Sequence, residues 1–336
     1  MNINGTISDI LEIISGVPQG SILGPILFNI FMNDFIQHIK STNTHNYADD
    51  NTLSAVAETI KKVINLLEKG ASEATHWLDI NYMIANVTKF HAIIATKDKQ
   101  ITVGLPIKVG NIVIKTEDIV KLLGVSLDNK IGFDNHITNL LKQASSKLNA
   151  IKRVNTFLNK SQKNTLCHSY VLSYFQHCCL AWHFGNTGNI HRLEKLHERV
   201  IRFTYSDYDT DYFELLQKNN LCTLYAQRVQ KMCCEVFKIQ SNTDKGYMSE
   251  LLTQRPSKYP ARNALDLYVP KVNQKTYGEN SFFRQAPEIW NSLSPQIQQS
   301  KCIEDFKRKI KEENLPCCRC QKCCLKHEEV KQNYQS

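Results

Sequence analysis

The pair of adjacent aspartates, Asp49 and Asp50, constrains the fold of this chain more than any other feature. It stands in NYADDN, residues 46–51, and residues 52–56 then follow a near-alternating, strand-like pattern. Because Asp and Asn favour turns, the local sequence predicts a hairpin with the pair at its tip. Adjacent carboxylates also repel each other unless a cation lies nearby, and Mg²⁺ binds carboxylate oxygens. Two interpretations stay open at this point: a plain hairpin tip and a metal site.

A loop and two helices are predicted around this hairpin. Residues 16–24, GVPQGSILG, form a loop rich in glycine and proline, and Pro25 suits the first position of a following helix. From Ile60 to Leu78, apolar residues recur at helical spacing. Short β-like runs follow at 90–95, 101–103, 107–114 and 119–127. The front of the chain therefore predicts an α+β fold, an antiparallel sheet with helices packed on one side.

Helical patterns dominate the second half of the chain. Asp134 is expected to cap a helix whose apolar face continues to Leu158, and residues 160–240 are mostly helical in pattern. A stretch rich in Pro, Tyr and Asn runs from about 241 to 295, before a basic amphipathic helix expected at 303–313.

The charge of the chain is divided unevenly. Residues 1–128 hold 10 Lys and Arg against 13 Asp and Glu, whereas residues 129–336 hold 31 against 19, and the whole chain carries a net charge of +9. A basic second half suits binding to a polyanion such as nucleic acid, and a solvated basic surface is the equal alternative.

Features of membrane and secreted proteins are not found in the sequence. Apolar runs stay shorter than the about 20 residues of a membrane span, and the first residues lack the basic region of a signal peptide. Twelve cysteines without such a signal indicate reduced thiols or metal ligands. We expect an intracellular protein that binds no membrane, in either nucleus or cytoplasm.

Four stretches of the chain resemble the reverse transcriptases of LINE-type (non-LTR) retrotransposons. They are SGVPQGSILGPILFNIFMNDF at 15–35, NYADDNTLSA at 46–55, THWLDINYMIANVTKF at 75–90 and VKLLGVSLDNKIGFDNHI at 120–137. The first two also stand at the separation that this family shows. The resemblance covers most of residues 12–315, with strong signals in 15–137.

The resemblance implies a partial polymerase palm at residues 1–128 and a mostly helical thumb or connection at 129–240. A C-terminal region of unknown role would follow at 241–315, and a cysteine-rich tail at 316–336. In the intact enzyme, such a palm carries out RNA-directed DNA synthesis by two-metal nucleotidyl transfer. Its partners are an RNA template, a DNA primer and deoxynucleoside triphosphates.

The same resemblance implies roles for individual residues. Asp49 would be the principal ligand of Mg²⁺ or Mn²⁺, with Asp50 in support, and Lys89 the proton donor to the pyrophosphate. For Lys89, a solvated surface lysine is the equal alternative. The residues expected at nucleotide and template are Gly16, Pro18, Gln19, Gly20, Ser21 and Tyr47. The residues expected to form the primer grip are Leu123, Gly124 and Val125.

The family also carries a third catalytic carboxylate, on a strand well before the GVPQG loop. Only fifteen residues precede Gly16 in this chain, and none resembles that run. The fingers that hold template and triphosphate are missing with it. The resemblance therefore implies an N-terminally truncated, inactive reverse transcriptase. The alternative is a non-enzymatic nucleic-acid-binding remnant that uses the basic helical half.

The tail contains a cysteine cluster, CCRCQKCCLKH, at residues 317–327. Two overlapping C-x2-C spacings and one C-x2-H spacing occur in it, and such clusters can bind Zn²⁺. Adventitious metal binding and read-through sequence are the alternatives. The candidate zinc ligands are Cys317, Cys320, Cys323 and His327.

Overall fold

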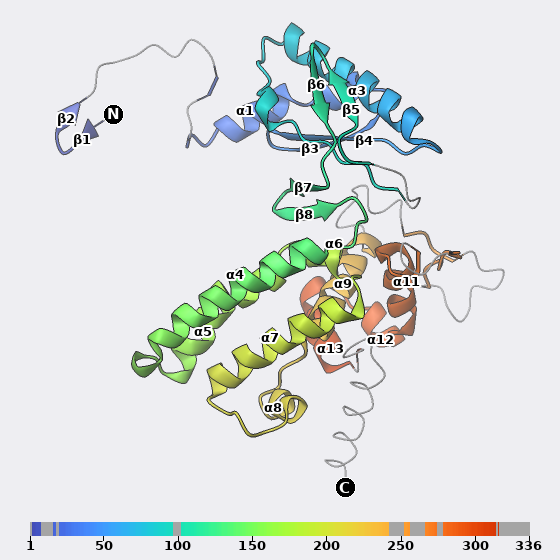
Figure 1. Ribbon diagram of the computed structural model, residues 1–336. Helices are drawn as coiled ribbons and strands as arrows, with labels where there is room; N and C mark the ends of the chain where they lie inside the picture. The colour runs from blue at the N-terminus through green and yellow to red at the C-terminus, as the bar shows by residue number, and fades with distance from the viewer. Residues whose placement is uncertain are drawn as a thin grey trace. The chain divides into compact units, whose positions relative to one another are not determined.

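The chain divides into two compact units. A computed structural model describes residues 2–7, 16–17, 20–96, 102–241, 252–255, 266–273, 278–313 and 315. The units are Met1–Val120 and Lys121–Ser336, called here the front unit and the helical unit (Figure 1). The finer divisions at 128, 240 and 315 stay predictions.

The front unit combines short antiparallel strand pairs with helices, which confirms the predicted α+β class. Its strands are β1 (Asn2–Ile3) with β2 (Thr6–Ile7), β3 (Asn43–Tyr47) with β4 (Asp50–Ser54), and β5 (Pro106–Val109) with β6 (Ile112–Lys115). Its helices are α1 (Gly24–Phe31), α2 (Phe35–His38) and α3 (Ile60–Ile80), and a 3-10 turn, η1, spans Val87–Lys89. The helix after Pro25, the helix from Ile60 and the hairpin around Asp49 all form as predicted.

A small aromatic core holds the front unit together. Trp77 on α3 is 1% exposed and packs edge-to-face on Phe31 and Phe35, with ring centroids 5.6 and 5.1 Å away. Such pairs contribute about 1 kcal/mol beyond the burial of their apolar area. The buried members of this core are Met32, Phe35, Ile39 and Trp77.

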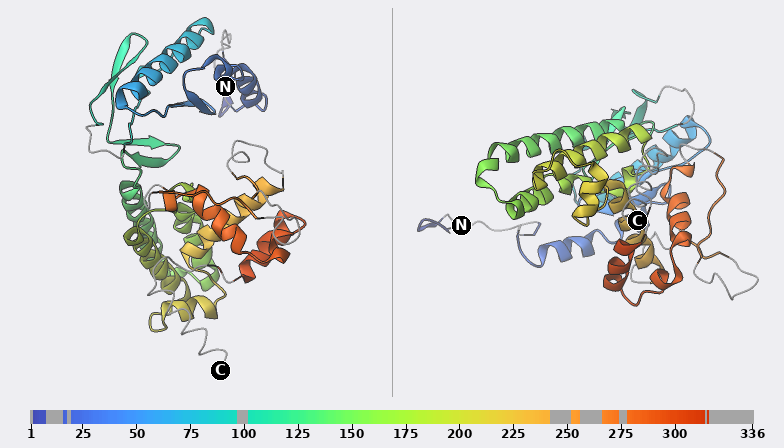
Figure 2. Two further views of the ribbon diagram at one scale, coloured as in Figure 1. Left: turned by 90° about the vertical axis from the view of Figure 1, so that its right-hand side faces the viewer. Right: turned by 90° about the horizontal axis from the view of Figure 1, so that it is seen from below.

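Helix α3 joins the two larger hairpins of the front unit (Figures 1 and 2). A Cβ on Gly70 would lie 2.5 Å from Thr42 Oγ1, so only glycine lets the chain before β3 come this close. On the other hairpin, Glu68 accepts the Lys108 N–H at 2.9 Å. The sequence predicts one sheet, but each described strand pairs with a single partner, so the strands form separate two-stranded hairpins. A larger sheet requires hydrogen bonds between the edge strands of different hairpins, and here α3 lies between the hairpins instead.

The run FHAIIA at residues 90–95 is not a strand, contrary to the prediction. Ile94 is buried, so the run is apolar for a packing reason. Among the bonds that the structure describes, the Glu117 N–H donates to the Ala92 carbonyl (2.8 Å), and His91 Nδ1 lies 2.7 Å from Glu117 Oε1. The Phe90 N–H donates only locally, to the Val87 carbonyl at 3.2 Å. A strand requires a ladder of such bonds.

The hairpin of β7 (Ile119–Leu122) and β8 (Val125–Asp128) leads into the helical unit. The helices of this unit are α4 (Asp134–Arg153), α5 (Lys160–Tyr170), α6 (Cys179–Trp182), α7 (Thr187–Tyr205), α8 (Tyr212–Lys218), α9 (Leu224–Gln240), α11 (Phe282–Ser292), α12 (Pro295–Gln298) and α13 (Ile303–Glu312). Its 3-10 turns are η2 (Asn155–Phe157) and η3 (Leu172–Phe175). The predicted helical content of 160–240 and the predicted helix at 303–313 are confirmed.

Asp134 does not cap α4, contrary to the prediction. It lies inside the helix, and Phe133 occupies the capping position with a φ of 60°. The carboxylate of Asp128 accepts the N–H groups of Gly132 and Phe133 at 3.0 and 2.7 Å and so orders the approach to the helix. The helix ends at Arg153, before Leu158, because η2 interrupts it.

Helices α4 and α7 run side by side in the same direction (Figures 1 and 2). Asp134, at the start of α4, accepts hydrogen bonds from the side chains of Asn186 and Asn189, at the start of α7. Near the other end, Lys152 Nζ lies 5.7 Å from the centroid of the Phe203 ring. These contacts fix the parallel register of the two helices.

Two large apolar clusters and a smaller one around α8 form the core of the described helical unit. One gathers the buried faces of α4, α5 and α7, with Ala144, Leu148 and Val200 fully enclosed. The other joins α9 to α11 and α13, where the Phe306 ring stacks on Phe237 with centroids 4.6 Å apart. None of the described helices combines the length and the apolar character that crossing a bilayer requires.

Candidate functional site

The β3–β4 hairpin presents Asp49 and Asp50 at its tip, as predicted. Tyr47 pairs with Asp50 in the register, so Ala48 and Asp49 form a two-residue turn. Ala48 takes a φ of 53°, a left-handed conformation that costs an ordinary residue about 1 kcal/mol. Both aspartates are exposed, and neither carboxylate has a hydrogen bond or ion pair within the described chain. The two carboxylates are therefore open to a cation.

The base of this hairpin is anchored to α3 through the half-buried carboxylate of Glu73. Its Oε2 accepts the N–H groups of Lys40 (2.7 Å) and Ser41 (3.0 Å), and its Oε1 accepts the Ser41 hydroxyl at 2.6 Å. Burial by itself would raise the pKa of Glu73, but these hydrogen bonds outweigh burial and lower the pKa below its ordinary value. The anchor holds the chain where it enters β3.

The GVPQG loop precedes α1, as predicted. Gly16 and Gly20 take φ values of 81° and 83°, which glycine adopts without strain, and no atom lies within 4 Å of the Cβ either would gain. Ser21 Oγ accepts the Gly24 N–H at 3.0 Å and orders the start of α1. Pro18 and Gln19, also expected at the nucleotide, lie outside the described residues.

Tyr47 and Lys89 have different places relative to the acidic pair. Tyr47 is 68% exposed and lies directly across the hairpin from Asp50. Lys89 is exposed at the end of η1, and among the described residues no hydrogen bond or ion pair joins it to either aspartate. The structure therefore brings Tyr47 to the acidic pair and shows no direct contact of Lys89 with it.

The residues expected as primer grip lie in the β7–β8 hairpin. Leu123 and Gly124 form its turn, with φ values of 46° and 86°. Leu123 is exposed, whereas Val125 is 5% exposed and belongs to the apolar cluster of α4, α5 and α7. One side of the hairpin is therefore part of the helical core, and its tip faces solvent.

A metal site with three or more protein ligands is not found in the described part of the chain: no group of three or more His, Cys, Asp or Glu side chains is placed to hold an ion. The candidate zinc ligands Cys317, Cys320, Cys323 and His327 lie outside the described residues.

Basic side chains gather along one side of the parallel helices α4 and α7. Arg192 donates to Thr138 Oγ1 at 3.1 Å, which places it at the seam between the helices. Lys195 and Arg199 follow Arg192 at helical spacing, and Lys142 follows Thr138 by one turn. The exposed members, called here the α4–α7 basic face, are Lys142, Arg153, Arg192, Lys195 and Arg199.

Carboxylates on these two helices are each held by other groups. Asp134 is bound by Asn186 and Asn189, and Glu198 forms an ion pair with Arg202 (2.9 Å). Glu194, the remaining one, points to α9, as described below. The charge of the α4–α7 basic face is therefore not compensated by acidic neighbours on α4 or α7.

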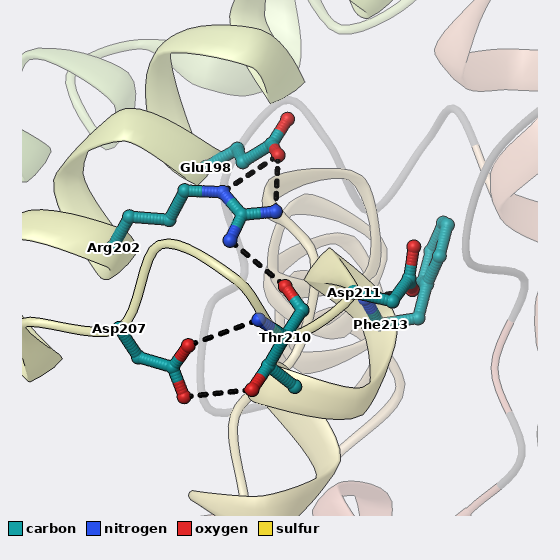
Figure 3. A network of polar contacts seen from close by, with 6 residues as sticks. All are labelled: Glu198, Arg202, Asp207, Thr210, Asp211 and Phe213. Carbon is teal, nitrogen blue, oxygen red and sulfur yellow. Dashed lines mark hydrogen bonds and ion pairs between the residues drawn. The ribbon is translucent and has the colours of Figure 1, made fainter.

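Arg202, a further basic residue of α7, is committed to a structural network (Figure 3). Its Nη1 donates to the Thr210 carbonyl at 2.8 Å in addition to the Glu198 pair. Asp207 accepts the Thr210 N–H and hydroxyl at 3.1 and 2.9 Å, which closes the loop between α7 and α8. Arg202 therefore orders this loop and is not available to a ligand in the way that Lys195 is.

A buried polar network between α7, α8 and α9 is not indicated by any sequence motif. His197 Nδ1 donates to Tyr212 Oη (2.7 Å), and Tyr212 donates to Glu194 Oε2 (3.1 Å). Glu194 also accepts the Tyr225 N–H at 2.7 Å, in the first turn of α9. Burial lowers the pKa of His197 to about 3 and raises that of Glu194.

Arg228 on α9 lies in the same core and is 1% exposed. Its Nε donates to His183 Nδ1 at 3.1 Å, whereas Nη1 and Nη2 find no hydrogen-bond partner among the described residues. Its guanidinium carbon lies 5.5 Å from the centroid of the Trp182 ring, a cation–π contact. Burial lowers the pKa of Arg228, against the attraction of Glu194. These groups hold three helices together. They are distant in sequence from the acidic hairpin tip and, unlike its exposed aspartates, they are buried.

Comparison with known proteins agrees with the sequence motifs. Residues 2–127 match the family model described as reverse transcriptase (RNA-dependent DNA polymerase). The RNA-directed DNA polymerase from mobile element jockey of Drosophila melanogaster is 26% identical over 155 residues, 44% of this chain and 17% of that protein. The chain is related to the reverse transcriptases of LINE-type retrotransposons.

Two further relatives support the similarity to the reverse transcriptases of LINE-type retrotransposons. The probable RNA-directed DNA polymerase from transposon X-element of Drosophila melanogaster is 21% identical over 198 residues, 57% of this chain and 22% of that protein. The Retrovirus-related Pol polyprotein from type-1 retrotransposable element R1 2 of Nasonia vitripennis is 24% identical over 178 residues, 50% of this chain and 43% of that protein. No solved structure matches the chain.

These matches cover only part of this chain and only part of the relatives. The chain spans less than half the length of the curated relatives it matches. The reverse transcriptase match includes the acidic hairpin, the described part of the GVPQG loop, Lys89 and the turn at Leu123 and Gly124. It ends before α4, so the α4–α7 basic face lies outside it.

Proposed function

We propose that the chain belongs to the machinery of RNA-directed DNA synthesis of a retrotransposon, with Asp49 and Asp50 as ligands of a divalent metal ion. The observation that carries this proposal is the turn at 48–49, which sets two carboxylates without described partners at an exposed tip. Hard cations such as Mg²⁺ or Mn²⁺ prefer carboxylate oxygens. When bound in a pair, such ions activate the primer 3′-oxygen and stabilise the departing pyrophosphate.

Other residues of the front unit would bind the substrates, an RNA template, a DNA primer and a deoxynucleoside triphosphate. Gly16 and Gly20, with positive φ and no side chain, let the backbone approach a nucleotide, while Ser21 orders the start of α1. Tyr47 would contact the nucleotide from across the hairpin. Lys89, whose ammonium group is exposed, is our proposed proton donor to pyrophosphate.

We further propose that the 336-residue chain does not extend primers by itself. Two-metal transfer requires more ligands than one acidic pair supplies, and the described residues bring no third metal-binding side chain to it. Purified chain with Mg²⁺ or Mn²⁺ and a primed RNA template is expected to leave the primer unextended. Extension that disappears in Asp49→Ala would contradict the proposed inactivity and support the proposed site.

The metal ligands can be tested without activity. Tb³⁺ binds carboxylates as Ca²⁺ does, and Tyr47, across from Asp50, would sensitise its emission. Sensitised emission is expected from the wild type, competed by Mg²⁺, and lost in Asp49→Asn and Asp50→Asn. Asp79→Asn, an exposed aspartate on α3, is the matched control. Emission that survives in both hairpin variants would exclude this metal site.

A second function, binding of single-stranded nucleic acid, is favoured by the α4–α7 basic face. Its positive charges lie along two fixed helices, and the carboxylates of these helices are engaged elsewhere. Lys and Arg that neutralise phosphates release counterions, so the affinity should fall steeply as salt concentration rises.

The test compares two triple variants that remove equal charge from the helical unit. Lys142→Gln, Lys195→Gln and Arg199→Gln together should weaken binding to a fluorescent RNA 20-mer and reduce the salt slope by about 2. Lys301→Gln, Lys307→Gln and Lys311→Gln, all exposed near or on α13, should leave both unchanged. Truncation at Pro316 should also change binding little. Equal effects of the two triple variants would assign the affinity to net charge alone.

A further inference from the structure

The turn of the β7–β8 hairpin is unfavourable by itself. Positive φ at both turn residues is the geometry of a type I′ turn, which favours Asn-Gly. Here Leu123 occupies the first position with a φ of 46°, at a cost of about 1 kcal/mol. A leucine in this place implies that other contacts hold the turn.

One such contact comes from His177, between η3 and α6. Its Nε2 lies 3.0 Å from the Leu123 carbonyl oxygen, which can only accept, so Nε2 carries the hydrogen. A Cβ on Gly124 would lie 2.9 Å from the same nitrogen, so Gly124 is needed for this approach as well as for its φ of 86°. Trp182, 1% exposed, donates its Nε1–H to the His177 carbonyl at 3.1 Å and fixes this segment to the core.

A second contact comes from His136 on α4. Its Nδ1 accepts the N–H of Ser126 in β8 at 3.3 Å, and its ring centroid lies 6.1 Å from that of Trp182. Burial, with a smaller effect of His177, lowers the pKa of His136, which keeps the ring neutral and Nδ1 able to accept. Val125, next to Ser126, is buried in the same core.

The two histidines therefore hold the hairpin at its tip and at its second strand. We propose that His136 and His177 are positioning residues, through which the helical unit sets where the Leu123–Gly124 tip meets the 3′ end of a bound primer. This inference rests on the proposed function in RNA-directed DNA synthesis and on the role of the hairpin as primer grip, which the resemblance in sequence implies. Neither histidine would touch the primer; each acts through a backbone group of the hairpin.

Conservative and disruptive variants of the full chain separate positioning from mere packing. His177→Gln keeps an N–H donor at similar reach, whereas His177→Phe keeps a ring without a donor. For His136, Asn keeps an acceptor and Phe does not. Amide hydrogen exchange of residues 119–128 should accelerate about tenfold in either Phe variant, as expected for one lost hydrogen bond, and return to near the wild-type rate in the Gln and Asn variants.

The position of the primer 3′ end is measured by photocrosslinking. An RNA template is annealed to a DNA primer that ends in 4-thiothymidine, and light crosslinks this nucleotide to the protein residues next to it. Crosslinking to residues 119–128 should fall severalfold in both Phe variants and recover in His177→Gln and His136→Asn. Unchanged exchange and crosslinking in the Phe variants would overturn the positioning role while leaving the primer grip intact. A wild-type hairpin that never crosslinks would overturn the primer-grip role itself and, with it, this inference.

Discussion

The front unit and the helical unit bury their apolar side chains to very different extents. In the described front unit the aromatic core has four buried members, whereas the clusters of the helical unit have eighteen and seventeen. Helix α1 exposes much of Ile26, Leu27, Ile30 and Phe31, and Ile84 is 99% exposed. Contiguous exposed apolar side chains mark surfaces that meet another partner.

The size of the core and the presence of candidate catalytic residues therefore do not go together in this chain. The unit that matches reverse transcriptases has the candidate catalytic residues but little core of its own. The described helical unit has much larger cores, and Glu194 and Arg228 are buried among its helices. The helical unit should therefore be stable independently, and the front unit should be the less stable of the two.

The largest effect should come from the buried network of the helical unit. Glu194→Ala removes the acceptor for Tyr212 and for the Tyr225 N–H and leaves Arg228 buried without its neighbouring negative charge. We expect a loss of about 3–5 kcal/mol in the free energy of unfolding of this unit. Hydrogen exchange of α7 and α9 should accelerate, with the front unit unchanged. The control Glu198→Ala removes a partly exposed ion pair and should cost about 1 kcal/mol or less.

Trp77→Ala is the corresponding test of the core of the front unit. It removes the side chain on which Phe31 and Phe35 pack, and such truncations cost about 3 kcal/mol or more. Because the core there is small, we expect hydrogen exchange throughout α1 and α3 to become that of unfolded chain, while α4 and α9 keep their protection. Protection lost in both units together would show that they unfold as one.

Acid should affect the units in a fixed order. The pKa of His197 is about 3 in the folded chain against 6.5 ordinarily, so its contribution is fully present above pH 6.5 and is lost as the pH falls. Between pH 6.5 and 5 the helical unit should lose about 2 kcal/mol, and His136, whose pKa is also lowered, adds to this loss. The front unit should respond below about pH 4.5, because Glu73, whose pKa is lowered, stabilises it above that value. The stability of each unit is measured by its urea midpoint at a series of pH values, with hydrogen exchange of peptides from that unit as the signal.

The smallest effect on stability should come from the exposed side of α1. Ile26→Lys with Ile30→Lys changes side chains that are 53% and 67% exposed, so we expect a change within about 0.5 kcal/mol. The same variant should reduce self-association in sedimentation experiments, because it removes exposed apolar area. A loss of several kcal/mol would show that this side of α1 is covered within the chain.

The acidic hairpin and the long helices could be predicted from sequence because their signals are local. NYADDN combines turn-forming residues with strand-like flanks, and the hairpin forms with Asp49 in the turn. Ile60–Ile80 begins after Thr59, whose side chain caps its first turn as Ser, Thr, Asn and Asp do at helix starts.

The remaining errors arise where distant residues decide the local structure. The run at 90–95 resembles a strand, but no ladder of partners reaches it in the described chain. Asp134 has the right residue type for a cap, yet Asp128 orders the start of α4 and Asp134 binds α7 instead. His136, His177 and Glu194 act through contacts across 10 to 54 positions, which no periodicity encodes.

The parallel direction of α4 and α7 also has a kinetic consequence. Helices joined by a short loop run antiparallel, so two parallel neighbours need a long connection; Thr138 and Arg192, in contact, are 54 positions apart. Closing such a loop costs chain entropy before any contact between α4 and α7 forms, and folding slows as the mean separation of contacting residues grows. We therefore expect α4 and α5 to pair early and α7 to dock late. On a ribosome, α4 would wait for more than fifty residues of further synthesis before its partner exists.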